Sequence, residues 1–113
     1  MKLNQDFTMA VETIQFLQKN KSKDYIQTEK IAEALGFSMG YLQKTMQTLS
    51  KYGIIDSKRG RIGGTRLGKR KVTLLDLWNL TCGEIDTANP AVPALKKPLK
   101  VFEDALSKVV ISK

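Results

Sequence analysis

The side chains of this chain that are best suited to binding chemistry are those of arginine and lysine. Seven of them fall in one stretch without an acidic residue: Lys58, Arg59, Arg61, Arg66, Lys69, Arg70 and Lys71. Four glycines lie in the same stretch: Gly60, Gly63, Gly64 and Gly68. Guanidinium and ammonium groups bind phosphate oxygens, and glycine lets the backbone take positive φ angles and approach a partner closely. The stretch predicts a contact surface for a phosphate-bearing partner.

Two observations indicate what kind of partner this is. The glycine spacing fits neither the nucleotide-binding loop that ends in Gly-Lys-Ser/Thr nor the dinucleotide fingerprint. The chain has 113 residues, with 19 lysines and arginines against 11 acidic residues, which gives a formal charge of +8. So large a positive charge on a small body favours a polyanionic partner such as nucleic acid. The alternative is a solvated hairpin whose glycines only shape a turn.

The residue types that are scarce argue against catalysis. The sequence has no histidine and one cysteine, Cys82. Histidine is the usual general base at neutral pH and the commonest metal ligand, so we expect neither an enzyme nor a metal site. A lone cysteine forms no intramolecular disulfide, and no stretch resembles a signal peptide or a membrane helix, so we expect a cytoplasmic protein without membrane contact. Cys82 is typical of a small buried residue, with a redox-responsive thiol as the alternative.

Helices must position the basic stretch. Apolar residues at helical spacing predict a first helix over residues 7–17. A short second helix should be capped by Thr28 and end at Gly36, and a third should begin almost at once with a capping serine, Ser38. So tight a turn between two helices predicts a helix-turn-helix.

The basic stretch follows the third helix directly. Ile54 and Ile55 before it, and Thr65 and Leu67 after it, favour strands, so we expect a β-hairpin there. A hairpin behind a helix-turn-helix is the wing of a winged-helix domain. A fourth helix should start at Thr73 with a capping box and pack its leucines and tryptophan against the first helix. The predicted fold class is mainly α with a small β-hairpin.

The carboxyl-terminal part is predicted to hold a dimer contact. We expect a winged-helix DNA-binding domain over residues 1–83, a linker over 84–97 and a dimerisation helix over 98–113, with Pro98 in the first helical position. Four apolar residues of that helix recur at spacings of three and four: Leu99, Phe102, Leu106 and Val109. Such a seam is typical of helix pairing and predicts a homodimer. The alternative is a seam that folds back on its own domain.

The order of these signals resembles the bacterial IscR and NsrR regulators, the Rrf2-type winged-helix repressors. Two motifs carry the resemblance. IAEALGFSMGYL is similar to the family's helix-turn-helix with its Ser-x-x-Tyr-Leu, and GIIDSKRGRIGGTRL is similar to its wing. Both stand in the family's order and at its separation. The resemblance implies a homodimeric transcription regulator, acting as a repressor, that binds a palindromic operator.

The resemblance also implies which residues read DNA. Family members use the start and outer face of the recognition helix, which here begins at Ser38, and a wing arginine, matched by Arg59, that enters the minor groove. Gln43 stands where the family commonly has glutamate, and an amide can pair with adenine where a carboxylate suits cytosine. Tyr41 is equally suited to the core. The candidate DNA-binding residues are Thr28, Ser38, Gly40, Tyr41, Gln43, Lys44, Gln47, Lys58, Arg59, Gly60, Arg61, Gly63, Gly64 and Arg66.

Many family members also hold an iron–sulfur cluster on three cysteines between the fourth helix and the dimer helix. This chain has none there, and the one thiolate of Cys82 is too few for a cluster with four ligands, so we expect no cofactor. The regulatory signal would then come from an effector protein or a small molecule that the sequence does not identify. Two other functions stay open, which are a winged-helix adaptor that binds proteins and a regulator that responds to oxidation of Cys82.

Overall fold

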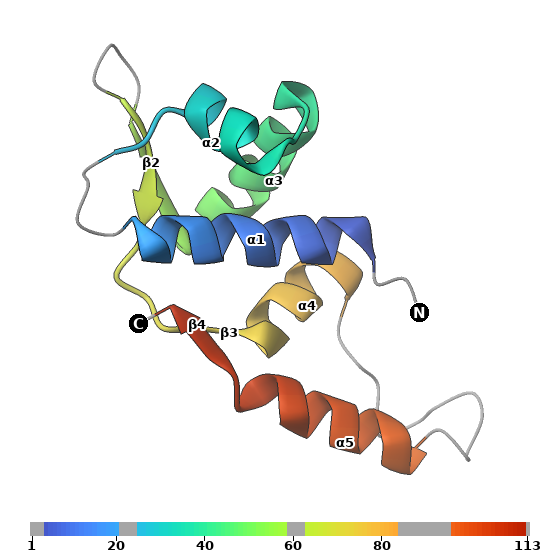
Figure 1. Ribbon diagram of the computed structural model, residues 1–113. Coiled ribbons are helices and arrows are strands. Elements are labelled where there is room, and N and C mark those ends of the chain that lie inside the picture. The colour runs from blue at the N-terminus through green and yellow to red at the C-terminus, as the bar shows by residue number, and fades with distance from the viewer. Residues whose placement is uncertain (1–3, 21–24, 59–62, 84–95, 113) are drawn as a thin grey trace.

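The computed structural model describes residues 4–20, 25–58, 63–83 and 96–112. In chain order their elements are α1 Gln5–Lys19, α2 Thr28–Leu35, α3 Met39–Lys51, β1 Ile55–Lys58, β2 Gly64–Leu67, β3 Val72–Thr73, α4 Leu74–Cys82, α5 Lys96–Ser107 and β4 Val110–Ser112. α1 crosses the middle of the molecule, with α2, α3 and the hairpin on one side and α4 and α5 on the other (Figure 1). The predicted class, mainly α with a small hairpin in a winged-helix arrangement, is confirmed.

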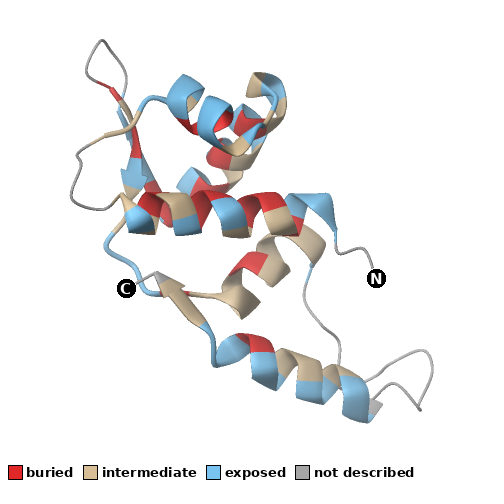
Figure 2. Cartoon of the chain, in the orientation of Figure 1, coloured by how far each residue is buried: buried red, intermediate tan, exposed pale blue. Residues whose placement is uncertain are grey.

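The core lies where the apolar faces of these elements meet α1. Figure 2 shows buried residues along α1 and on the facing sides of α2 and α3. The most deeply buried side chains include Ile14, Ile31, Leu42, Leu49, Ile54 and Leu77, none of them more than 1% exposed. They come from α1, α2, α3, the start of the hairpin and α4, so one core holds the helix-turn-helix, the hairpin and the fourth helix together.

The helix-turn-helix forms at the predicted place. Gly36 ends α2 in the left-handed conformation, with φ of 73°, and α3 begins three residues later. The cap assigned to Thr28 is wrong, because Gln27 holds that position and Thr28 is the first helical residue. The reason lies just before the helix. Ile26 pairs with Thr65 of the hairpin, so the chain is extended up to Gln27 and turns into the helix from there.

α4 forms as its sequence signals predict. The hydroxyl of Thr73 accepts a hydrogen bond from the Asp76 N–H at 3.2 Å, and the Asp76 carboxylate accepts one from the Thr73 N–H at 2.9 Å. This is the predicted capping box. Trp78 meets Phe7 of α1 edge to face, with 5.1 Å between ring centroids, so the predicted packing of α4 on α1 is also confirmed. Within the described ranges, no helix combines the length and apolar character that crossing a membrane requires.

The carboxyl-terminal segment departs from its predicted form. α5 begins at Lys96 and ends at Ser107, so the prediction of a helix over 98–113 is wrong. Pro98 is the third helical residue rather than the first, which a helix tolerates because the N–H groups of its first turn have no intrahelical partner. Val110–Ser112 forms β4 and pairs antiparallel with β3. β-Branched residues at this point of the chain favour the strand. The predicted linker lies mostly outside the described residues.

The apolar seam is divided as a result. Leu106 is 7% exposed, and Phe102 meets Trp78 edge to face at 4.9 Å between centroids, so both residues pack on their own chain. Val109 lies beyond the end of α5, where its carbonyl accepts a hydrogen bond from the Leu74 N–H at 2.9 Å. The placement of Val109 in a helical seam is therefore wrong. Dimerisation through the remaining exposed side of α5 stays a prediction.

Candidate DNA-binding surface

A groove lies between the helix-turn-helix and the hairpin. Six of the predicted DNA-binding residues line it: Thr28, Gln43, Gln47, Lys58, Gly63 and Gly64. Glu29 and Met39 line it as well, and the sequence prediction missed both. The groove therefore combines three side-chain amides, three hydroxyls, one ammonium group, one carboxylate and glycine backbone. Amides suit the edges of bases, and ammonium and backbone N–H groups suit phosphate oxygens.

α3 presents its polar residues away from the core because the helical period separates them from the apolar ones. Gly40, Gln43, Lys44 and Gln47 are exposed, whereas the opposite face is buried. Ser38 occupies the cap position, as predicted, but its hydroxyl makes no capping hydrogen bond to the helix. The exposed residues at the start of α3 are those that a recognition helix brings to base edges.

Tyr41 and Lys44 belong to a different place on α3. They line a small hollow on the side of α1, together with Asp6 and Leu80 among others. The hydroxyl of Tyr41 donates a hydrogen bond to the Asp6 carboxylate of α1. Tyr41 is half-buried, and this hydrogen bond joins the recognition helix to the first helix. The structure does not bring Tyr41 and Lys44 into the groove that holds Gln43 and Gln47.

The hairpin is held to the helix-turn-helix through its second strand. β1 and β2 pair antiparallel, with Lys58 opposite Gly64 and Asp56 opposite Arg66. On its other edge β2 pairs with Ile26, through two backbone hydrogen bonds of 2.9 and 2.7 Å to Thr65. The predicted positive φ is observed at Gly64, where it is 146°. Three predicted contacts, Arg59, Gly60 and Arg61, lie outside the described residues.

One face of the hairpin carries a group of residues that sequence reasoning missed in part. The guanidinium of Arg66 lies 4.5 Å from the centroid of the Tyr25 ring, and the Lys58 ammonium lies 5.6 Å from the same centroid. Nε of Arg66 also lies 3.8 Å from the Asp56 carboxylate. The available signal for Tyr25 was a lone aromatic beside a β-branched residue in an otherwise polar connection between two predicted helices.

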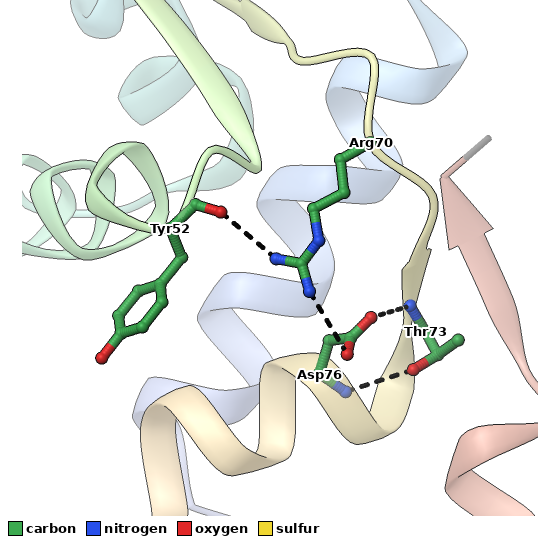
Figure 3. Close-up of polar contacts among 4 residues, drawn as sticks. All are labelled: Tyr52, Arg70, Thr73 and Asp76. Carbon is green, nitrogen blue, oxygen red and sulfur yellow. Dashed lines mark hydrogen bonds and ion pairs between the residues drawn. The ribbon is translucent and has the colours of Figure 1, made fainter.

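Arg70, which the sequence places in the basic stretch, makes contacts with other parts of its own chain. Its guanidinium donates to the Tyr52 carbonyl at the end of α3, at 3.2 Å, and lies 3.5 Å from the Asp76 carboxylate at the start of α4 (Figure 3). A cation is favourable at a helix carboxyl terminus, and a carboxylate at an amino terminus. Arg70 therefore ties the recognition helix to α4, which carries α5.

Arg70→Ala should affect stability more than DNA contact. Both partners of the ion pair are partly exposed to solvent, so we expect the free energy of unfolding to fall by at most about 1 kcal/mol, and by less at high salt. Thermal unfolding at two salt concentrations measures this. Lys69→Ala is the matched control, because Lys69 is exposed and adjacent. A loss of stability that is equal at both salt concentrations would contradict the electrostatic role of Arg70.

The comparison with protein families decides what this architecture belongs to. The model of the Rrf2 family, described as "Iron-dependent Transcriptional regulator", matches residues 3–110. The chain belongs to the Rrf2 family. Membership confirms the predicted class for this Rrf2 protein, a winged-helix DNA-binding transcriptional regulator.

Two curated relatives are similar to this Rrf2 protein in sequence. It is 31% identical to Protein aau3 of Rhizobium meliloti over an alignment of 125 positions, which covers 94% of this chain and 79% of that protein. It is 33% identical to the HTH-type transcriptional regulator NsrR of Bacillus licheniformis over 69 residues, which cover 61% of this chain and 48% of NsrR. The match thus spans about half the length of that regulator.

Solved structures agree on the fold. CymR, the global cysteine regulator of B. subtilis, superposes with a TM-score of 0.85 at 20% identity, over 98% of this chain and 93% of CymR. T. potens IscR superposes with a TM-score of 0.80 at 20% identity, over 98% of this chain and 83% of IscR. The elements of this Rrf2 protein therefore share the arrangement of both structures.

The family description raises the question of an iron site. Cys82, the last residue of α4, is half-buried, with its sulfur 3.6 Å from the Thr81 hydroxyl. The sequence holds no second cysteine and no histidine, and the described residues contain no cluster of three or more candidate metal ligands. Protein iron–sulfur clusters take four ligands, mainly cysteine thiolates, so the donor set of this Rrf2 protein does not fit one. A redox role for Cys82 stays a prediction.

Proposed function

We propose that this Rrf2 protein is a homodimeric, cytoplasmic repressor that binds a palindromic operator. α3 would enter the major groove and the β1–β2 hairpin would follow the flanking minor groove. The observation that carries the proposal is the groove in which Gln43 and Gln47 of α3 lie together with Lys58 of the hairpin. An amide reads the edge of adenine, and an ammonium group binds phosphate, so this one surface carries groups suited to base contact and groups suited to phosphate contact.

The exposed side of α5 supports the homodimer. Val101 is 66% exposed, and Val109, just past the helix, is 43% exposed. An apolar hollow lies beside α5, lined by Val11, Leu74 and Phe102 among others. Exposed apolar side chains and an open apolar hollow on one small domain are typical of a protein that pairs with a second copy. A two-fold pair would place its recognition helices about one DNA turn, ~34 Å, apart.

We also propose that this repressor works without an iron–sulfur cluster or other cofactor and catalyses no reaction. The support is the donor set, with one cysteine and no histidine in the sequence. The signal that releases DNA would then come from an effector of another kind, either a protein or a small molecule.

Selection of bound duplexes from a random DNA pool tests the proposal. We expect a palindromic consensus, with an affinity that falls steeply with salt, by a slope of about −0.9 per neutralised phosphate. Gln43→Ala should relax the preference at one base pair by about 1–3 kcal/mol. Lys69→Ala is the control, which should weaken binding to all sequences alike. Absence of salt-sensitive binding to any duplex would contradict DNA recognition and favour the protein-binding adaptor.

A further inference from the structure

We propose that Tyr25 is a positioning residue of the wing, which fixes the side chains of Arg66 and Lys58 for contact with DNA phosphate. The inference rests on the proposed contact between the hairpin and DNA. It assigns a role to a residue before the helix-turn-helix, outside both the recognition helix and the hairpin.

The geometry brings one aromatic ring under two cations from different strands. Because Ile26 pairs with Thr65, the preceding Tyr25 lies beside Arg66, on the same face of the sheet. The Arg66 guanidinium lies 4.5 Å from the ring centroid, and the Lys58 ammonium lies 5.6 Å from it. Both distances are within the range at which the electron-rich face of an aromatic ring attracts a cation.

The ring is also fixed relative to the recognition helix. The two hydrogen bonds between Ile26 and Thr65 join the segment before α2 to β2, and Gln27, the next residue, holds the N-cap position of α2. Tyr25 is half-buried in this segment. The same few residues therefore set the hairpin against the helix-turn-helix and hold the cations of the hairpin. The position of these cations follows the position of α2 and α3.

The contact of these cations with the ring suits a phosphate contact for two reasons. A guanidinium has five N–H donors, so one that lies over a ring can still donate from the N–H groups that point away from it. Arginine and lysine also lose much rotamer freedom when they are fixed, and a ring that restrains them before DNA arrives reduces the entropy lost on binding. The ion pair between Arg66 and Asp56 restrains the Arg66 side chain less than the ring does, because the pair is exposed and solvent and salt screen it.

The test is a set of DNA titrations with a short duplex of mixed sequence at low salt, because phosphate contacts need no particular sequence. Tyr25→Leu removes the ring and should weaken binding about two- to five-fold. Tyr25→Phe keeps the ring and should bind like wild type. In a background with Arg66→Ala and Lys58→Ala, Tyr25→Leu should cause no further loss, because residues that act through one another are not additive.

Two other sets of results would overturn either the positioning role of Tyr25 or the proposed contact of the wing with DNA. If Tyr25→Leu weakens binding equally in both backgrounds, or not at all while Arg66→Ala and Lys58→Ala weaken it, Tyr25 does not position these cations. If the protein binds DNA but Arg66→Ala and Lys58→Ala leave its affinity unchanged, the wing contact of the proposed function is wrong, and the role of Tyr25 falls with it. Thermal unfolding of every variant establishes that the fold is kept.

Discussion

The Gly64→Ala variant should melt about 10 °C or more below wild type, through a loss of about 2–4 kcal/mol in the free energy of unfolding. A Cβ at position 64 would lie 2.3 Å from the Ile26 carbonyl oxygen and 2.8 Å from the Gln27 nitrogen. Both neighbours are backbone atoms that cannot rotate away. The φ of Gly64, 146°, is also one that residues with a side chain rarely adopt.

DNA affinity should fall in the same variant by about ten-fold or more. The clash falls on the segment that pairs with Thr65, so relief of the clash must part the hairpin from the start of α2. Loss of that junction would leave the cations of the wing without a fixed place relative to the recognition helix. Side chains that must be ordered during binding cost entropy that prepositioned ones do not, so loss of this junction weakens binding.

Gly36→Ala is the matched control. Gly36 also has a positive φ, 73°, but no atom lies within 4 Å of the Cβ that alanine would add. This variant should lose only the backbone preference, about 1–2 kcal/mol. Differential scanning calorimetry of the two variants then separates conformational preference from the clash. Equal destabilisation of the two would mean that close approach of Ile26 to Gly64 contributes nothing.

The sequence predicted the DNA-binding half well because its signals are local. The end of α2 at Gly36, the helix α3 and the capping box at Thr73 are each determined by residues close together in the sequence, and each forms as expected. The cap of α2 was misplaced to Thr28 because pairing of Ile26 with Thr65, distant in the sequence, fixes where that helix begins. The contact of Arg66 and Lys58 with the Tyr25 ring depends on the same long-range pairing, and no local pattern shows it.

The carboxyl-terminal half was harder to predict for a similar reason. The spacing of apolar residues cannot tell a seam that faces a partner from one that faces its own domain. The structure divides the seam, since Phe102 and Leu106 pack inside while Val101, which the spacing omitted, is exposed. The β-branched residues of Val110–Ser112 favour a strand, but its pairing partner, β3, is distant in the sequence, so local signals alone did not separate it from the helix before it.

The elements on the two sides of α1, which are α2, α3 and the hairpin on one side and α4 and α5 on the other (Figure 1), are joined in a way that suits transmission of a signal. α1 packs against both the hairpin side and α4, and Arg70 links the end of α3 to the start of α4. α4 in turn holds α5 through the ring contact of Trp78 with Phe102. A change at the α5 surface therefore has a continuous packed route to the recognition helix. If α5 forms the dimer contact, the spacing of the two recognition helices depends on this route.

Val101→Glu should convert the dimer into a monomer and lower the affinity for a palindromic operator by about 100-fold or more. The side chain is 66% exposed, so the substitution should leave the fold of one chain unchanged. In a dimer contact, however, the carboxylate would lose water without gaining a partner. Loss of the second half-site removes the gain from linked binding, which is about 10²–10⁴-fold.

Sedimentation equilibrium measures the first effect and titration of the selected operator measures the second. Ser107→Glu is the control, because it adds the same charge at an exposed position six residues along α5, on another face of the helix. It should remain dimeric and bind as wild type does. A Val101→Glu protein that stays dimeric would move the contact away from the exposed side of α5, and a monomeric wild type would overturn the homodimer itself. Because each chain carries one recognition helix, a monomer could not hold both halves of a palindrome, so the two measurements must change together.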